Sequence, residues 1–328
     1  MSMDWSQERV LVTGGAGFLG REILATLAAR GVTEDRRFAP RSVACDLCDP
    51  REATRLLRGQ HPTGPGWSPT VVIHAAARCG GIGYNQASGS ALFSANMAMG
   101  MAVMDAAAHV EGDVLRRFLF VGTVCSYPAH CPTPFREDAI WDGYPEPTNA
   151  QYGIAKRALM EYGVARFRET DTRFMTVIPT NLYGPGDVFL PERAHVIPSM
   201  IVRFLQAAEA GAHEVLLWGS GTVTREFLFV EDAARGIVDA AECPDPPDRM
   251  NIGSGEEVTI AHLARLVADA CGHQGGIAWD ELRPDGQRKR HVSTERAQRA
   301  IGWAARTCLA DGIARTVEWC RAHPEAWR

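Results

Sequence analysis

The chain has 328 residues, 46% of them hydrophobic and 22% charged, with a formal net charge of -5 at pH 7. This length exceeds one average domain, and the composition is that of a soluble globular α/β enzyme with a smaller appended lobe. The slightly negative charge excludes a global basic surface, so no nucleic-acid partner is expected.

The amino-terminal stretch and the cysteines indicate a cytoplasmic protein. Residues 1–15 run into a strand without the basic and apolar regions of an export signal. We find no apolar run near the roughly 18 residues that span a bilayer, so no membrane partner is expected. Nine scattered cysteines are expected to be reduced. Cys45 and Cys48 form a C-x-x-C pair, but no second pair follows at zinc-site spacing, and no metal site is predicted.

In chain order, the first half alternates strands and helices. Residues 9–31 predict a strand, a glycine turn and a helix, because an apolar run precedes "TGGAGFLG" and apolar side chains then recur at helical spacing. The following segments predict a strand end at "RSVACDL", a helix at "PREATRLLRG", a strand at "TVVIHAAA", a helix over 91–110, a strand at "RFLFVG", a helix over 151–169 and a strand at "RFMTVIP". This alternation predicts an α/β fold, a Rossmann-type doubly wound parallel sheet.

The second half is less regular. It predicts a helix after Pro198, a strand at "EVLLWGSG", helices at "VEDAARGIVDAAE" and "TIAHLARLVADACG", and a basic loop "RPDGQRKRH". We expect residues 1–180 to form the dinucleotide-binding domain, with about 226–255 returning to it, and 181–328 to form mainly a smaller C-terminal α/β substrate lobe. The apolar helices 91–110 and 151–168 suit a homodimer interface.

The glycine loop predicts a dinucleotide site. Gly14, Gly17 and Gly20 follow a strand and open a helix, where missing Cβ atoms let a pyrophosphate approach backbone N–H groups at the positive helix end. The region after the first helix offers Asp35, which suits NAD, and Arg36, Arg37 and Arg41, which suit the 2'-phosphate of NADP. The arginines favour NADP, with NAD possible.

A second constellation predicts chemistry at a carbonyl oxygen. Tyr152 and Lys156 lie four apart, so on a helix the ammonium would lie beside the phenol and lower its pKa. Thr123, at the end of a predicted strand, completes a trio that could hold a carbonyl oxygen while a nicotinamide exchanges hydride.

With these motifs the chain resembles the extended short-chain dehydrogenase/reductase family of nucleotide-sugar enzymes, and within it the GDP-L-fucose synthase subgroup. The motifs that carry the resemblance follow one another in the family's order: "AAARCGGIG", "GTVCSYP", "EPTNAQYGIAK", "PTNLYGPGD", "HVIPSMIVRF", "WGSGTVTREFLFVEDAA", "NIGSGEEVTI" and "RPDGQRK". The resemblance implies a dimeric NADPH-dependent enzyme that epimerises C3 and C5 of a GDP-4-keto-6-deoxy-mannose-like sugar and reduces C4.

The resemblance also implies roles for single residues. Cys125 and His195 would move protons at C3 and C5, and Thr123, Tyr152 and Lys156 would act at O4. By residue type alone, Cys125 is typical of a small buried hydrophobe and His195 of a helix start. The predicted cofactor-binding residues are Gly14, Gly17, Phe18, Leu19, Gly20, Arg36, Asp46, Leu47, Ala75, Ala76, Ala77, Tyr152, Lys156, Pro179, Asn181 and Leu182. The predicted substrate-binding residues are Gly81, Asn181, His195, Arg203, Trp218, Arg225 and Arg290, with Arg288 and Lys289 beside them.

Departures from the subgroup keep two alternatives open. Thr123 stands where serine is usual, and the loop "GGAGFLG" is closer to that of epimerases that retain NAD. The alternatives are an NAD-retaining GDP-hexose or GDP-heptose epimerase and a C4 reductase without full epimerisation. A 4,6-dehydratase would carry Asp-Glu where this chain has Val124 and Cys125. A non-catalytic dinucleotide sensor is a more remote alternative on the same fold.

Overall fold

The structure, a computed structural model, describes residues 3–110, 115–283 and 286–328. In this part of the chain, six parallel strands form the main sheet in the order β2-β1-β3-β4-β5-β9. Their bounds are β1 (Val10–Thr13), β2 (Arg37–Phe38), β3 (Val71–His74), β4 (Arg117–Val121), β5 (Arg173–Pro179) and β9 (Arg249–Ile252). The strand order reverses between β1 and β3, and ligands of such sheets bind beyond the carboxyl ends of the strands at that point. The predicted Rossmann-type α/β class is confirmed.

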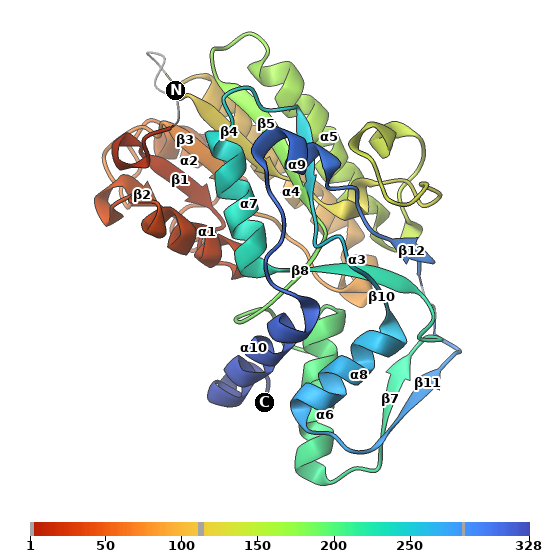
Figure 1. The fold of residues 1–328 in the computed structure, drawn as a ribbon. Coiled ribbons are helices and arrows are strands. Elements are labelled where there is room, and N and C mark those ends of the chain that lie inside the picture. The colour runs from red at the N-terminus through yellow and green to blue at the C-terminus, as the bar shows by residue number, and fades with distance from the viewer. Residues whose placement is uncertain (1–2, 111–114, 284–285) are drawn as a thin grey trace.

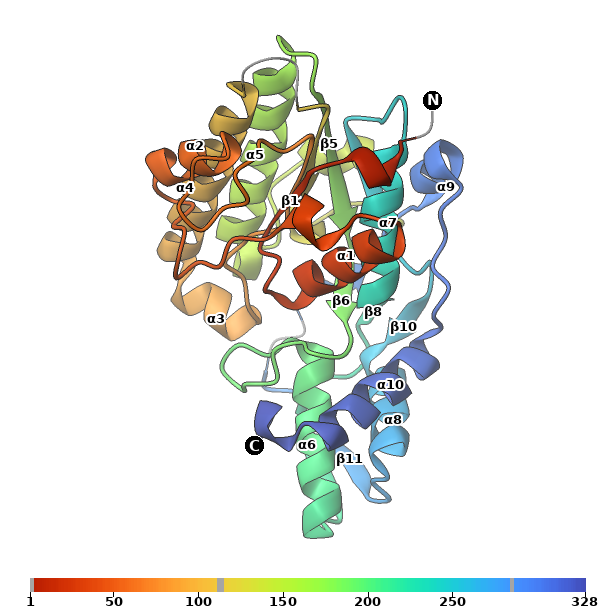
Figure 2. The ribbon, with the colours of Figure 1, turned by 90° about the vertical axis from the view of Figure 1, so that its left-hand side faces the viewer.

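Helices cover both faces of this sheet (Figure 2). On one face lie α1 (Phe18–Ala29) and α7 (Val230–Glu242), and on the other α2 (Pro50–Leu57), α4 (Gly89–Ala108) and α5 (Ala150–Phe167). Because both faces are covered, β1 and β3 are buried along their whole length, which explains their continuous apolar sequences.

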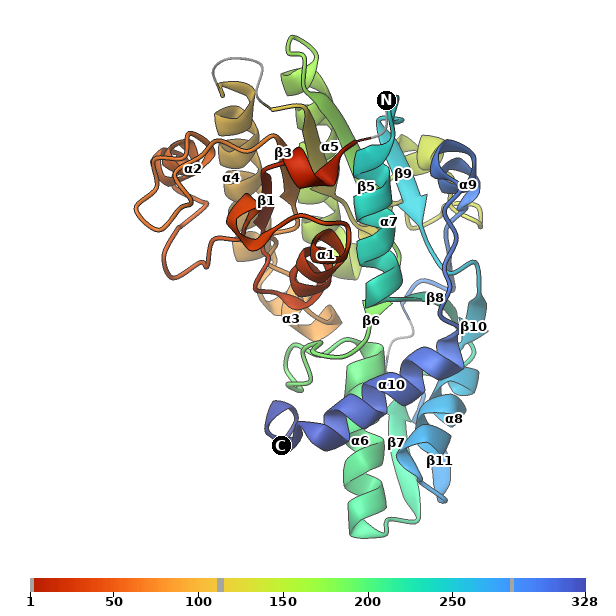
Figure 3. The same ribbon diagram turned by 60° about the vertical axis from the view of Figure 1, so that its left-hand side comes forward.

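A second group of elements lies below the carboxyl ends of the main strands (Figures 1 and 3). Strand β8 (Thr224–Phe229) pairs with β6 (Asn181–Tyr183), β10 (Glu257–Thr259) and β12 (Lys289–Arg290). Below it lie α6 (Val196–Ala210), α8 (Ile260–Cys271), α10 (Leu309–Ala322) and the parallel pair β7 (Glu214–Trp218) and β11 (Gly276–Asp280). The remaining helices are α3 (Ile82–Ala87), α9 (Glu295–Ile301) and short 3-10 turns, among them η2 (Glu34–Arg36) and η3 (Val124–Ser126).

Two predicted elements differ in the structure. The expected strand end at residues 42–47 is turn and irregular backbone. Pro40 cannot donate to a strand ladder, and the Asp46 carboxylate instead accepts the Cys48 N–H at 3.0 Å. Helix α6 begins at Val196 rather than after Pro198, because proline is tolerated in a first turn, where its missing N–H leaves no bond unmade. Residues 284–285 of the predicted basic loop, and residues 1–2, lie outside the described residues.

Helix α4 corrects the expectation about apolar runs. The helix has 20 residues, and an 18-residue window of it has a mean hydropathy of 1.3, so it is long and apolar enough to cross a membrane by length and composition alone. Half of that stretch is buried inside the protein, as in the core helix of a soluble protein. No continuous apolar run is visible in this part of the sequence, because scattered Ser, Asn and Gly residues interrupt it.

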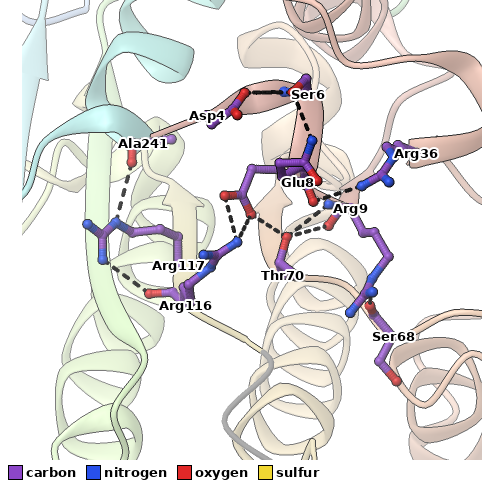
Figure 4. A network of polar contacts seen from close by, with 11 residues as sticks. Asp4, Ser6, Glu8, Arg9, Arg36, Ser68, Thr70, Arg116, Arg117 and Ala241 are labelled. Atoms are coloured by element: carbon purple, nitrogen blue, oxygen red, sulfur yellow. Dashed lines mark hydrogen bonds and ion pairs between the residues drawn. The ribbon is translucent and has the colours of Figure 1, made fainter. Parts of the chain in front are cut away.

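A polar network ties the amino ends of the strands together (Figure 4). Arg116 donates to both carboxylate oxygens of the buried Glu8 at 2.6 Å, and the Thr70 hydroxyl donates to Glu8 at 2.5 Å. Arg36 lies at the same edge and donates to the Gln7 carbonyl at 2.9 Å. This edge is opposite the one where the glycine loop follows β1.

Candidate active site

The glycine loop forms a tight cradle at the start of α1. Gly14 has φ +75°, and a Cβ there would lie 2.7 Å from the Ala76 nitrogen. A Cβ on Gly20 would lie 2.1 Å from the Gly14 carbonyl oxygen. Gly17 is the N-cap of α1, and a Cβ on it would lie 3.1 Å from the same oxygen. Any side chain would therefore open the turn. The loop leaves the N–H groups at the start of α1 clear of side chains, which fits a pyrophosphate.

Most other predicted cofactor residues surround this cradle. The loop after β3 is held by the Ala75 N–H, which donates to the Thr13 carbonyl at 3.1 Å. Across the carboxyl edge, Asn181 donates through Nδ2 to the Glu226 carbonyl at 2.8 Å. The other predicted residues at this edge are Phe18, Leu19, Ala77, Pro179 and Leu182, while Asp46 and Leu47 lie in the irregular segment before α2.

Arg36 does not lie where the sequence prediction placed it. It precedes β2 and belongs to the network at the amino edge of the sheet, so its guanidinium cannot join the glycine loop without breaking that contact. Arg37 likewise donates to the Val32 carbonyl. Arg41 follows the carboxyl end of β2 and is exposed, which makes it the better placed of the three for a 2'-phosphate.

The strand-end hydroxyl and the thiol share one short turn. Thr123 follows β4 and caps η3, where its Oγ1 accepts the Cys125 N–H at 3.2 Å. Helix α5 packs against this turn through Gly153, where a Cβ would lie only 2.2 Å from the Cys125 carbonyl oxygen. This close approach brings Tyr152, the residue before Gly153, next to the turn.

Tyr152 interacts with both members of the turn, by a hydrogen bond with Thr123 and electrostatically with Cys125. Its phenol hydrogen-bonds the Thr123 side chain. Burial raises the pKa of Tyr152 well above its usual value near 10, and the thiols of Cys79 and Cys125 add to the rise, while the Thr123 hydrogen bond lowers it. The expected lowering of the phenol pKa by Lys156 is therefore wrong for this arrangement. A phenol that keeps its proton is an acid, which is the form that a ketone reduction requires.

Lys156 points into the sheet beside this cluster. Its Nζ donates to the Val121 carbonyl at 2.9 Å and lies 4.5 Å above the centre of the Phe120 ring. Burial lowers the pKa of Lys156 to about 8, and the nearby Cys79 thiol raises it. The lysine therefore titrates near neutrality rather than near 10.5.

The thiol of Cys125 faces an arginine from the second group of elements. Arg290, on β12, lies 3.7 Å from Sγ through Nη1 and contacts Gln287 Oε1 through Nε at 3.1 Å. Arg290 is only 7% exposed, so its charge acts at short range. The thiol therefore lies 3.7 Å from the positive charge of a buried guanidinium.

His195 lies at the N-cap of α6, next to the loop after β3. Burial of the ring lowers the pKa of His195, although part of the residue stays exposed, and a hydrogen bond with the Gly80 backbone raises it. The two segments are also joined by the Gly81 N–H, which donates to the Arg193 carbonyl at 3.1 Å. A Cβ on Gly81 would lie 2.5 Å from the Ala194 carbonyl oxygen. The structure thus seats His195 against residues 80–81, one residue from Cys79.

Two ionisable groups at this site were missed from the sequence. Cys79, in the same loop, interacts electrostatically with Lys156 and Cys125, and burial raises the pKa of its thiol. Asp187, in the loop after β6, accepts the Val188 N–H at 2.7 Å through Oδ1, and within the described residues its buried Oδ2 has no hydrogen-bond partner. Burial raises the pKa of Asp187 to about 7. The signal was available, since both residues lie in glycine-rich loops directly after strands.

The remaining predicted substrate residues form two further groups. Arg225 donates to the Gln287 carbonyl at 2.6 Å, which places it beside Arg290, and exposed Arg288 and Lys289 line a nearby hollow of about 540 Å³. Arg203 and Trp218 lie farther down the second group of elements. The Arg203 guanidinium is 6.0 Å from the Trp218 ring centre, and that ring is 59% exposed.

A doubly wound parallel sheet with a glycine cradle and a Tyr/Lys helix at its carboxyl edge defines a dinucleotide-binding α/β enzyme fold. The chain belongs to the NAD dependent epimerase/dehydratase family, whose model matches residues 10–253.

Particular relatives cover nearly the whole chain. It is 34% identical to a probable GDP-L-fucose synthase 1 of Oryza sativa subsp. japonica over 95% of this chain and 91% of the relative. It is 32% identical to the GDP-L-fucose synthase of Escherichia coli strain K12 over 98% and 99%. The structure of a GDP-L-fucose synthetase from Naegleria fowleri bound to NADP superposes with a TM-score of 0.83 at 25% identity, covering 97% of this chain and 95% of that one. The resemblance predicted from the motifs is confirmed.

Proposed function

We propose that the protein is an NADP-dependent nucleotide-sugar epimerase/reductase that acts on a GDP-linked 4-keto-6-deoxy-mannose-like sugar. One observation carries this proposal: a thiol beside an arginine, Cys125 and Arg290, lies in the same cluster as the Thr123–Tyr152 hydroxyl pair. A reductase needs only the hydroxyl pair. The thiol adds a proton acceptor for the carbons next to the ketone, and curated relatives that cover nearly the whole chain are named GDP-L-fucose synthase.

The chain's own residues perform the proton transfers. Cys125, beside Arg290, removes a proton from C3 or C5, and His195 returns one from the other side of the ring. Tyr152 and Thr123 hydrogen-bond O4, stabilise the enolate, and Tyr152 then protonates O4 during reduction. NADPH, when bound, supplies the hydride that C4 receives. The glycine cradle is suited to its pyrophosphate and Arg41 to its 2'-phosphate.

Substrate binding falls to the second group of elements. In this proposal residues 1–180, with about 226–255, bind the dinucleotide, and 181–328 mainly bind the nucleotide sugar. Arg225, close to Arg290 through Gln287, is placed for the diphosphate, and Arg203 with Trp218 for the base.

We also propose a cytoplasmic homodimer. The supporting observation is α4, where the apolar side chains of Phe93 and Met101 are 37% and 38% exposed. Exposed apolar side chains two turns apart on a helix suit a two-fold interface.

Absorbance at 340 nm, with GDP-4-keto-6-deoxy-mannose and NADPH, tests the function. Stoichiometric loss of NADPH with a product inverted at C3 and C5 supports it, and NADPH loss without inversion identifies a C4 reductase. Turnover without loss of absorbance identifies an epimerase that retains its cofactor. Cofactor binding without turnover of any nucleotide sugar would leave a sensor.

A further inference from the structure

Three potential metal ligands lie together in a part of the chain that the proposed reaction does not use. Cys45 belongs to the irregular segment before α2, Glu52 to the first turn of α2, and His61 to the loop after it. One ligand atom from each residue lies within 4.8 Å of the other two. Thiolate, carboxylate and imidazole are the ligand types that zinc takes in proteins.

The imidazole of His61 is held in one orientation. Its side chain is 2% exposed, and its Nε2 lies 2.9 Å from Glu52 Oε2. On the other side of the ring, Nδ1 accepts the Thr63 backbone N–H at 3.3 Å and lies 2.9 Å from the Thr63 hydroxyl oxygen, so the ring proton is on Nε2. Metal-binding histidines are commonly fixed by such a contact at the nitrogen that does not bind the metal.

A plain hydrogen bond between His61 and Glu52 explains two of the three residues but not the third. Cys45 is 2% exposed, and within the described residues no hydrogen bond reaches its Sγ. A divalent cation would give this buried sulfur a partner, which it would bind as thiolate.

We propose that Cys45, Glu52 and His61 bind a zinc ion, with water as the fourth ligand. Zinc binding at Nε2 releases one proton from the Cys45 thiol and moves the His61 proton from Nε2 to Nδ1, where Thr63 Oγ1, 2.9 Å away, accepts it in place of the Thr63 N–H contact. The step involves no oxidation or reduction. The C-x-x-C pattern suggested different ligands, but Cys48 is directed elsewhere, with its Sγ 3.9 Å from the Ala95 carbonyl oxygen.

Such a site would fix the segment between β2 and α2, which has no strand ladder to hold it. That segment borders the glycine loop, since a Cβ on Gly15 would lie 2.3 Å from the Ala39 Cβ. It also carries Asp46 and Leu47, the residues expected near the adenine. Zinc would therefore stabilise the adenosine side of the cofactor site, whatever reaction the enzyme performs.

Zinc and cobalt binding to the full chain, freed of metal with a chelator, tests the proposal. We expect about one Zn²⁺ per chain and a rise in the thermal midpoint with added zinc. Co²⁺ in its place should give a near-ultraviolet thiolate-to-cobalt absorption band. Absence of that band in the wild-type chain would overturn the proposal.

Two variants and a control identify the ligands. Cys45→Ser should lose the band and the thermal shift, while its far-ultraviolet circular dichroism stays that of the wild type. Glu52→Gln, which keeps the size of the side chain but not its charge, should weaken zinc binding about tenfold or more. Cys308→Ser, at an exposed cysteine far along the chain, should bind as the wild type does. A band that survives in Cys45→Ser would also refute the site.

Discussion

At the scale of the residue, the phenol and the thiol of the active site have separable tasks. The Tyr152 phenol is buried with a raised pKa and bonds Thr123, so it stays protonated and suits donation to O4. Cys125 lies against Arg290, which suits proton removal from carbon. Because the two steps involve different atoms of the sugar, substitutions should affect them independently.

Tyr152→Phe removes only the donor for O4. We expect hydride transfer to slow by about 10² or more, as is usual on loss of a general acid, while exchange of solvent deuterium into C3 or C5 continues at a reduced rate. Stopped-flow absorbance at 340 nm measures the first, and NMR of the recovered sugar the second. A near-normal reduction rate would contradict the role of the phenol.

Cys125→Ser replaces the thiol with a hydroxyl that cannot ionise near neutral pH. We expect NADPH binding to be unchanged and incorporation of solvent deuterium at C3 and C5 to stop. Cys308→Ser, at an exposed cysteine at the start of α10, is the control and should exchange normally. Undiminished exchange in Cys125→Ser would remove the thiol from the mechanism.

Asp187 predicts a pH dependence of stability. Its pKa is about 7 in the folded protein and about 3.9 in the unfolded chain. Between these pH values the unfolded chain has already lost the Asp187 proton while the folded protein still holds it. Stability therefore falls as pH rises from about 4 to about 7. Asp187→Asn removes this loss. The difference in unfolding free energy between the variant and the wild type should therefore be about 1–3 kcal/mol larger at pH 8 than at pH 4, in favour of the variant. Urea denaturation at both pH values measures it, and an equal change at both would contradict the burial of an ionisable carboxyl.

At the scale of the element, the close packing of α5 on η3 sets the distance between Tyr152 and the Thr123–Cys125 turn. A Cβ on Gly153 would overlap backbone, the Cys125 carbonyl, and backbone cannot rotate away as a flexible side chain can. The contact therefore exists only because residue 153 is glycine.

Gly153→Ala should push η3 from α5 and misplace the hydroxyl pair. We expect kcat to fall by about 10² and the unfolding free energy by about 1–3 kcal/mol, as overpacking usually costs. Gly83→Ala is the control, because a Cβ on that helical glycine meets nothing within 4 Å. Normal kcat in Gly153→Ala would show that this contact does not position the site.

At the scale of the whole molecule, sequence reasoning was most accurate where local pattern and tertiary structure agree. Continuous apolar runs predicted the buried strands, and the glycine spacing predicted the cradle at Gly14 and Gly20. The predictions failed where contacts between residues far apart in the sequence determine the position of a side chain. Arg36 was predicted by distance along the chain, but the edge of the sheet on which it lies depends on where β2 begins.

The same limit explains the groups that were missed. Cys79 is near Lys156 only because the loop after β3 meets helix α5 at the carboxyl edge. Cys45 is near His61 only because the chain folds around α2, which lies between them in the sequence. Neither pairing leaves a periodic signal in the sequence. By contrast, Pro40 and Asp46 were local evidence against a strand at residues 42–47, but the apolar residues in this segment favoured a strand.

Glu226 joins the parts of the molecule that hold the proposed substrate. Its carboxylate is fully buried on β8, where Oε1 accepts the Gly255 N–H and Oε2 the Val292 N–H, each at 2.8 Å. Gly255 precedes β10, and Val292 follows β12, which carries Arg290. One side chain thus ties β8 to the segments that adjoin β10 and β12.

Glu226→Gln keeps the shape but turns one acceptor into a donor. An amide NH₂ then faces a backbone N–H that has no other partner at hand, so we expect a loss of about 1–3 kcal/mol in unfolding free energy. Because β12 shifts with its hydrogen bond, the KM for the nucleotide sugar should rise while NADPH binding stays the same. Glu256→Gln, at an exposed acid in the adjacent loop, is the control for charge alone and should change neither. Equal stability of the two variants, or a rise in the dissociation constant for NADPH with an unchanged KM for the sugar, would show that this carboxylate does not hold the substrate side of the molecule in place.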